Sequence, residues 1–192
     1  MRYFILALVG CLLLTGACVQ KRADRSPARE SAVTVALKEM VAEDQRLRTD
    51  ATLDYSIVRA TDQKHHEKIF ELLAQGRITQ AADLYRAALL LQHADPSSCR
   101  ECYLLAHYLA RQAVELGYDE ARYLAAANLD RYLVFSDQIQ KYGTYYNVDS
   151  IGRWYLFPID SLTTDSDRAR WDVPPLEDLI RRIDRMNSES EK

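Results

Sequence analysis

The chain has 192 residues, 25 of them basic and 28 acidic, and a formal net charge of −3. This length suits one ordinary domain with a real core, and a hydrophobic fraction of 48% excludes a wholly disordered chain. No block of like charge stands out along the sequence, so the composition gives no indication of a nucleic-acid partner.

The N-terminus has the pattern of an export signal. Arg2 precedes residues 3–14, an uncharged and mostly apolar run that fits a signal-peptide core and is too short to span a bilayer. Thr15-Gly16-Ala17-Cys18 then places small residues directly before a cysteine, as in a lipoprotein processing site. An ordinary cleaved signal and an uncleaved anchor remain alternatives.

We therefore expect a lipoprotein signal peptide over residues 1–17, with the lipid attached to Cys18. The polar residues 18–30 then form a tether. Val19, rather than an aspartate, follows the cysteine, and this resembles the outer-membrane default in enteric-type sorting. The expected location is thus the periplasmic face of a membrane, reached through the N-terminal lipid.

A single domain is expected over residues 31–187, followed by a charged tail at residues 188–192. Apolar residues recur at helical spacing through its first part. Thr79 is a candidate N-cap, and Ser98 with Glu101 forms a candidate capping box. Helices are expected over residues 31–48, 62–75, 79–94, 98–116 and 119–135.

A faint repeat relates two of these segments. Gly76 and the helix after it resemble Gly117 and the helix after that, with an offset of about 40 residues. The fold class is therefore mainly α: antiparallel helical hairpins with tetratricopeptide- or Sel1-like packing, too few for a solenoid.

The pattern changes after Phe135. Aromatic residues flank a glycine-containing turn at residues 149–152, which predicts a small C-terminal β-hairpin. A short helix near residues 164–171 and a last helix over residues 175–186 complete the expected fold.

Three polar segments interrupt apolar surroundings: Gln92-His93-Ala94-Asp95, Asp130-Arg131, and Gln140-Lys141-Tyr142-Gly143-Thr144. Their order and spacing resemble the motif series of a bacterial family of uncharacterised helical proteins, many of them exported. Tyr145 stands where that family often has glutamine. The resemblance implies a helical fold and export, and it implies no defined activity.

A shared polar pocket is one hypothesis for these segments. His93 beside Asp130 would form a base and its orienting carboxylate, which gives a hydrolase-like enzyme as one alternative. A structural network is the other: Arg131 would pair with Asp44 or Asp95, and Asp130 with Gln92, His93 or a hairpin amide. The candidate residues are Asp44, His65, Gln92, His93, Asp130, Arg131, Gln140 and Tyr142.

Cys99 and Cys102 lie three residues apart, at the expected start of a helix. A helix N-terminus lowers the pKa of a thiol, so a thiol oxidoreductase is a second alternative. Because the βαβ context of such enzymes is missing, we expect a short structural disulfide instead.

The function we expect is a non-enzymatic, periplasm-facing lipoprotein that acts as a binding or structural module for a protein or small ligand. No cofactor is expected. No metal is expected either, because His65 and His66 project about 100° apart on a helix and the sequence has no zinc-type spacing.

Overall fold

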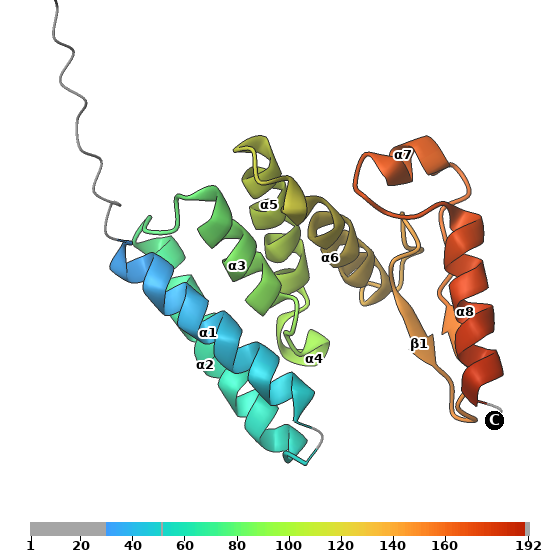
Figure 1. Cartoon of the computed structure of the whole chain (residues 1–192), viewed down its shortest axis with the longest axis horizontal. Helices are drawn as coiled ribbons and strands as arrows, with labels where there is room; N and C mark the ends of the chain where they lie inside the picture. The colour runs from blue at the N-terminus through green and yellow to red at the C-terminus, as the bar shows by residue number, and fades with distance from the viewer. Residues whose placement is uncertain (1–29, 51, 191–192) are drawn as a thin grey trace, which may run out of the picture.

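The computed structural model describes residues 30–50 and 52–190; the expected signal peptide, Cys18 and most of the expected tether lie outside them. The described part is mostly helical and carries a small antiparallel sheet in its C-terminal part, as expected (Figure 1). None of its helices combines the length and apolar character needed to cross a membrane. The N-terminal helices are α1 (Ala32–Thr49), α2 (Tyr55–Ala74), α3 (Ala81–Leu91), α4 (Pro96–Cys99), α5 (Glu101–Glu115) and α6 (Arg122–Val134).

The C-terminal part consists of a hairpin and two helices. Strands β1 and β2 pair in antiparallel register, with Asn147 opposite Tyr155. The N-cap Thr164 and Asp167 form a reciprocal capping box at the next helix. The last helix runs further than expected, through residues 188–190 of the expected tail. The elements are β1 (Tyr146–Val148), β2 (Trp154–Leu156), α7 (Asp165–Ala169) and α8 (Leu176–Ser190).

Two helices had wrongly predicted boundaries. Helix α2 begins seven residues before the expected position, because the side chain of Asp54 accepts from the amide of Ser56 and caps it there. Helix α3 is shorter at both ends. Its N-cap is Gln80 rather than Thr79, and Gln92 is its C-cap.

The predicted capping box at Ser98 was also wrong. Asp95 accepts from the amide of Ser97 and caps α4, whose first residue is Pro96. Proline is well suited to that first position, so Asp95-Pro96 starts a helix as well as ending the previous segment. Cys99 is consequently the last residue of α4 and not the first of the long helix α5.

The main core lies between the N-terminal helices. Helix α3 packs against α1, α2 and α5, and α5 packs in turn against α6. Figure 1 shows this succession from α1 and α2 at one side toward α6. Small residues allow the close approach of α5 and α6: Ala106, Ala110, Ala113, Ala121 and Ala125 are fully buried. Whether this succession is a repeat of the tetratricopeptide type stays a prediction.

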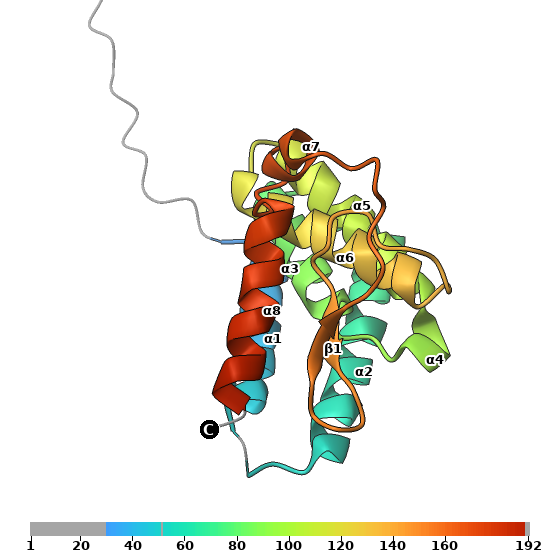
Figure 2. The same cartoon turned by 90° about the vertical axis from the view of Figure 1, so that its right-hand side faces the viewer.

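A second, smaller core holds the C-terminal part. Tyr142, Val173 and Leu179 pack there against Ala126 of α6. Figure 1 shows the hairpin and α8 together at the side of the molecule opposite α1 and α2, and this side faces the viewer in Figure 2. Asn187 of α8 binds both backbone groups of Trp154, at 2.7 and 3.1 Å, which fixes the helix on β2.

One carboxylate joins the two parts. Asp130 of α6 has an exposed fraction of 0%. Its oxygens accept from the backbone amides of Lys141, Tyr142 and Thr144 at 2.7–2.9 Å. The hydroxyl of Thr144 donates to it as well, at 2.7 Å. Of the partners expected for Asp130, the backbone amide was therefore the right one.

The same loop needs glycine at its centre. Gly143 has φ of 89°, a left-handed conformation that side chains disfavour. A Cβ atom there would lie 2.9 Å from Ile159 and 3.1 Å from Leu179. The loop of residues 141–144 is therefore shaped by its backbone, which Asp130 binds.

We predict that Asp130→Ala lowers the free energy of unfolding by about 3–5 kcal/mol, because it strands buried donors that no solvent can reach. Urea unfolding of the purified chain measures this. Lys141→Ala is the matched control: its side chain is exposed and its amide stays in place, so its midpoint should not move. An unchanged midpoint in Asp130→Ala would contradict the assigned role.

Candidate functional sites

Asp44 belongs to a charged network between α1, α2 and α3. Its buried carboxylate accepts from Gln45 at 2.8 Å and from Arg48 at 2.9 Å. Arg48 also donates to Asp62 of α2 at 2.6 Å. The guanidinium group thus joins two carboxylates on neighbouring helices.

His93 and His66 lie beside this network. The Nε2 atom of His93 is 3.8 Å from Asp44, and that of His66 is 3.1 Å from the carbonyl of Leu90. Burial lowers the pKa of both imidazoles, to about 4 for His93. For His93 the nearby Arg48 adds to this effect and outweighs the attraction of Asp44. At neutral pH the contact of His93 with Asp44 is therefore not an ion pair.

His65 lies elsewhere on α2. Its Nε2 atom is 3.2 Å from Glu43 of α1, so it joins the first two helices. Its Nδ1 atom is buried without a hydrogen-bond partner among the described residues.

Gln140 and Tyr142 belong to the Asp130 region. The Gln140 side chain is fully buried. Its Nε2 donates to the carbonyls of Tyr145 and Phe157 at 2.9 Å, and its Oε1 accepts from the amide of Tyr145 at 2.9 Å. Every polar group of this amide is thereby engaged with backbone, and it holds the start of the hairpin.

Arg131 has neither of its expected partners. No salt bridge from the described residues reaches it, and its only hydrogen bond is a long one, 3.5 Å, to the carbonyl of Ala127. Its guanidinium carbon lies 5.8 Å from the ring centre of Tyr145. The side chain is half-buried, and Gln92 lines the same cleft.

The candidate residues therefore occupy three places rather than one pocket. Asp44 and His93 lie in the charged network, Asp130 binds the loop, and Arg131 faces a cleft with Gln92. Asp130 and Arg131 project about 100° apart on α6, so their side chains contact different parts of the protein. No hydrogen bond or ion pair joins His93 to Asp130 in residues 30–50 and 52–190, and the expected base–carboxylate pair is not assembled.

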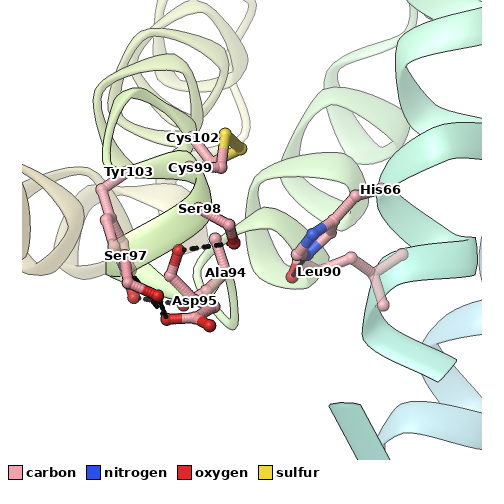
Figure 3. Close-up of a disulfide and its surroundings, with 9 residues drawn as sticks. All are labelled: His66, Leu90, Ala94, Asp95, Ser97, Ser98, Cys99, Cys102 and Tyr103. Atoms are coloured by element: carbon pink, nitrogen blue, oxygen red, sulfur yellow. Dashed lines mark hydrogen bonds between the residues drawn. A yellow bond between two sulfur atoms is a disulfide. The ribbon is translucent and has the colours of Figure 1, made fainter. Parts of the chain in front are cut away.

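Cys99 and Cys102 lie at disulfide distance, as expected, with Cα atoms 5.3 Å apart. They line a cleft of about 600 Å³ between α2 and the segment after α3, together with His66 and His93. Figure 3 shows the sulfur atoms above the Asp95 cap, with His66 projecting from α2 toward Leu90. Cys102 is buried and Cys99 is half-buried.

Arg168 is the principal residue that the sequence did not indicate. It is 2% exposed and donates to the carbonyls of Tyr142 and Thr163 at 3.0 and 2.9 Å. It thus holds the loop of residues 141–144 through a carbonyl group, whereas Asp130 binds the amides of the same loop. The capping box at Thr164 could have pointed to it, because the fourth residue after an N-cap returns to the same helix face.

In the described part of the chain, no group of three or more histidine, cysteine, aspartate or glutamate side chains is placed to hold a metal ion. Comparison of the chain with protein-family models, curated proteins and solved structures finds no match. The sites must therefore be interpreted from their own geometry.

We predict that acid destabilises the fold through His93. The half-buried imidazole of His93 has a pKa of about 4 in the folded chain, whereas in the unfolded chain it takes up its proton near pH 6.5. Stability therefore falls as the pH drops below that value. The expected loss between pH 7 and 5 is about 2 kcal/mol. Burial raises the pKa of Asp62, which opposes part of this loss.

Urea unfolding at pH 7 and pH 5 measures the difference. His93→Gln should reduce the pH dependence, whereas the exposed control Lys64→Gln should keep that of the natural chain. An equal pH dependence in all three proteins would contradict this role of His93.

Proposed function

We propose that this chain is an exported lipoprotein, anchored through Cys18 and facing the periplasm from the outer membrane, whose helical domain binds a small ligand without catalysing a reaction. The apolar run of residues 3–14 and the small residues before Cys18 support export and lipidation. The similarity of the three polar segments to a family with many exported members supports the same location.

One observation carries the ligand-binding part of the proposal. Each of the three polar segments contributes one residue to the same cleft: Gln92, Arg131 and Thr144. The cleft has a volume of about 460 Å³, within the size range of small-molecule sites. Residues that are distant in sequence and meet at one concavity are typical of a binding site.

A hydrolase-like reaction has less support. Both oxygens of Asp130 are engaged with the loop of residues 141–144, and Asp130 does not orient His93. His93 itself is held neutral by burial beside Arg48. These arrangements favour structural roles for both residues.

We propose a structural role for the disulfide as well. Cys99 ends a four-residue helix, so neither cysteine occupies the first position of a long helix, the setting that lowers the pKa of a thiol most. Burial of Cys102 also limits attack by an external thiol.

Lipidation of Cys18 gives one prediction. Cells grown with labelled palmitate should yield labelled protein in the membrane fraction, because several acyl chains on one cysteine anchor stably. Cys18→Ser should lose the label and leave that fraction. Cys11→Ser, within the same signal region, is the control and should retain it. Equal labelling of the natural chain and Cys18→Ser contradicts the proposal.

The proposed binding of a small ligand gives a second prediction. The chain purified from its native membranes and analysed by native mass spectrometry should carry a small molecule at near one equivalent. Tyr145→Ala, which removes one wall of the cleft, should carry less, whereas Tyr108→Ala on the exposed face of α5 should carry the same amount. Absence of a bound molecule, or equal loading of both variants, would count against a binding function at this cleft.

A further inference from the structure

The cleft beside Arg131 has a distinctive lining. Helix α3 contributes Tyr85, Leu89 and Gln92, which share one face at a spacing of three to four residues. The other walls come from α6, the start of the hairpin and α8. The lining is polar and aromatic rather than aliphatic: Tyr85, Leu89, Gln92, Glu120, Tyr123, Leu124, Ala127, Arg131, Thr144, Tyr145, Tyr146 and Arg182.

Arg131 is exceptional among the arginines of the described residues. Every other arginine that is buried or half-buried there has a carboxylate oxygen within 4.0 Å, at Arg48, Arg86, Arg111, Arg122 and Arg168. Arg131 has none, although a partly desolvated cation needs compensation more than an exposed one. Its guanidinium group has five N–H donors and makes one long hydrogen bond.

A second guanidinium group lies at the same cleft. Arg182 of α8 donates to the hydroxyl of Tyr146 at 3.0 Å, and no carboxylate in the described part of the chain pairs with it. Its carbon lies 5.2 Å from the Tyr146 ring centre, as Arg131 lies over Tyr145. Contact with an aromatic face orients a guanidinium plane while leaving its N–H edges available.

The positive charges of Arg131 and Arg182 act on the same residue of the cleft, Tyr123. Burial raises the pKa of the Tyr123 hydroxyl, whereas the positive charges of Arg182 and Arg131 lower it. Tyr123 projects from α6 into this cleft, so the two guanidinium groups influence one shared site. Glu120 is the acidic residue of the lining, and it is exposed at the rim.

Building on the proposed binding function, we propose that the ligand of this cleft is a sugar acid or sugar phosphate, whose oxyanion contacts Arg131 and Arg182. Guanidinium groups bind carboxylate and phosphate through paired, charge-assisted hydrogen bonds. A sugar ring lies against the tyrosines. Its hydroxyl groups bind Gln92, Glu120 and the tyrosine hydroxyls, which supply both donors and acceptors.

Three probes that share one ring test this. Glucose, glucuronate and glucose 6-phosphate are titrated into the full-length protein in detergent, freed of co-purified molecules, with calorimetry as the readout. We expect one or both anions to bind at least about tenfold more tightly than glucose, the gain of a charge-assisted hydrogen bond. Comparison of the two anions distinguishes a carboxylate from a phosphate ligand.

Matched variants test whether the two arginines of the cleft cause the preference for an anion. Arg131→Gln should weaken binding of the anion about tenfold or more without changing the affinity for glucose. Arg182→Gln should weaken it less, since Arg182 is exposed. Arg153→Gln is the control: this arginine is exposed on the hairpin, outside the cleft, and its substitution should have no effect.

Three results overturn the proposal. Equal affinity for glucose and both anions, or an unchanged anion affinity in Arg131→Gln, would leave a ligand site without selectivity for charge. Binding of none of the probes also overturns it. The molecule that co-purifies with the natural chain tests separately whether the cleft binds ligands. If that molecule is neutral, the proposal of an anionic ligand is wrong and the proposed binding function still stands.

Discussion

The docking of the C-terminal part depends on a buried carboxylate without a cation. Asp130 is compensated by backbone amides and one hydroxyl of residues 141–144, and no salt bridge from the described residues reaches it. Burial of a charge is costly unless hydrogen bonds replace its water. Helix α6 therefore needs the loop to compensate its buried charge, and the loop needs α6 to bind its amides. Arg168 also holds the loop, through the carbonyl of Tyr142.

Much of the fold could be predicted because its signals are local. The short helix after the hairpin and the turn before β2 are set by residues three or four apart, and both were predicted. The start of α2 was missed because the apolar residues of its first turns do not form a buried stripe: Tyr55 and Ile57 are exposed there, and Val58 is buried. Asp95-Pro96 was ambiguous, since the same pair can end one helix and cap another.

The sites were harder to predict, because a sequence gives the polar residues but not the directions in which they face. Asp130 and Arg131 are adjacent, yet one binds a buried loop and the other faces a cleft. His93 follows Gln92 directly and belongs to a different network. Arg182 carried no signal at all, because an arginine on an exposed amphipathic helix gives no indication of its tertiary neighbours.

Recognition of the loop through its main chain has a consequence for how such a protein can evolve. Asp130 binds N–H groups that almost any residue would supply, so natural selection can exchange the exposed side chain at position 141 without loss of the anchor, whereas Tyr142 is also held by its packing in the second core. Gly143 and Thr144 lack this freedom, because one has a conformation reserved for glycine and the other donates its hydroxyl. Among four successive residues, the freedom to vary is thus confined to the first.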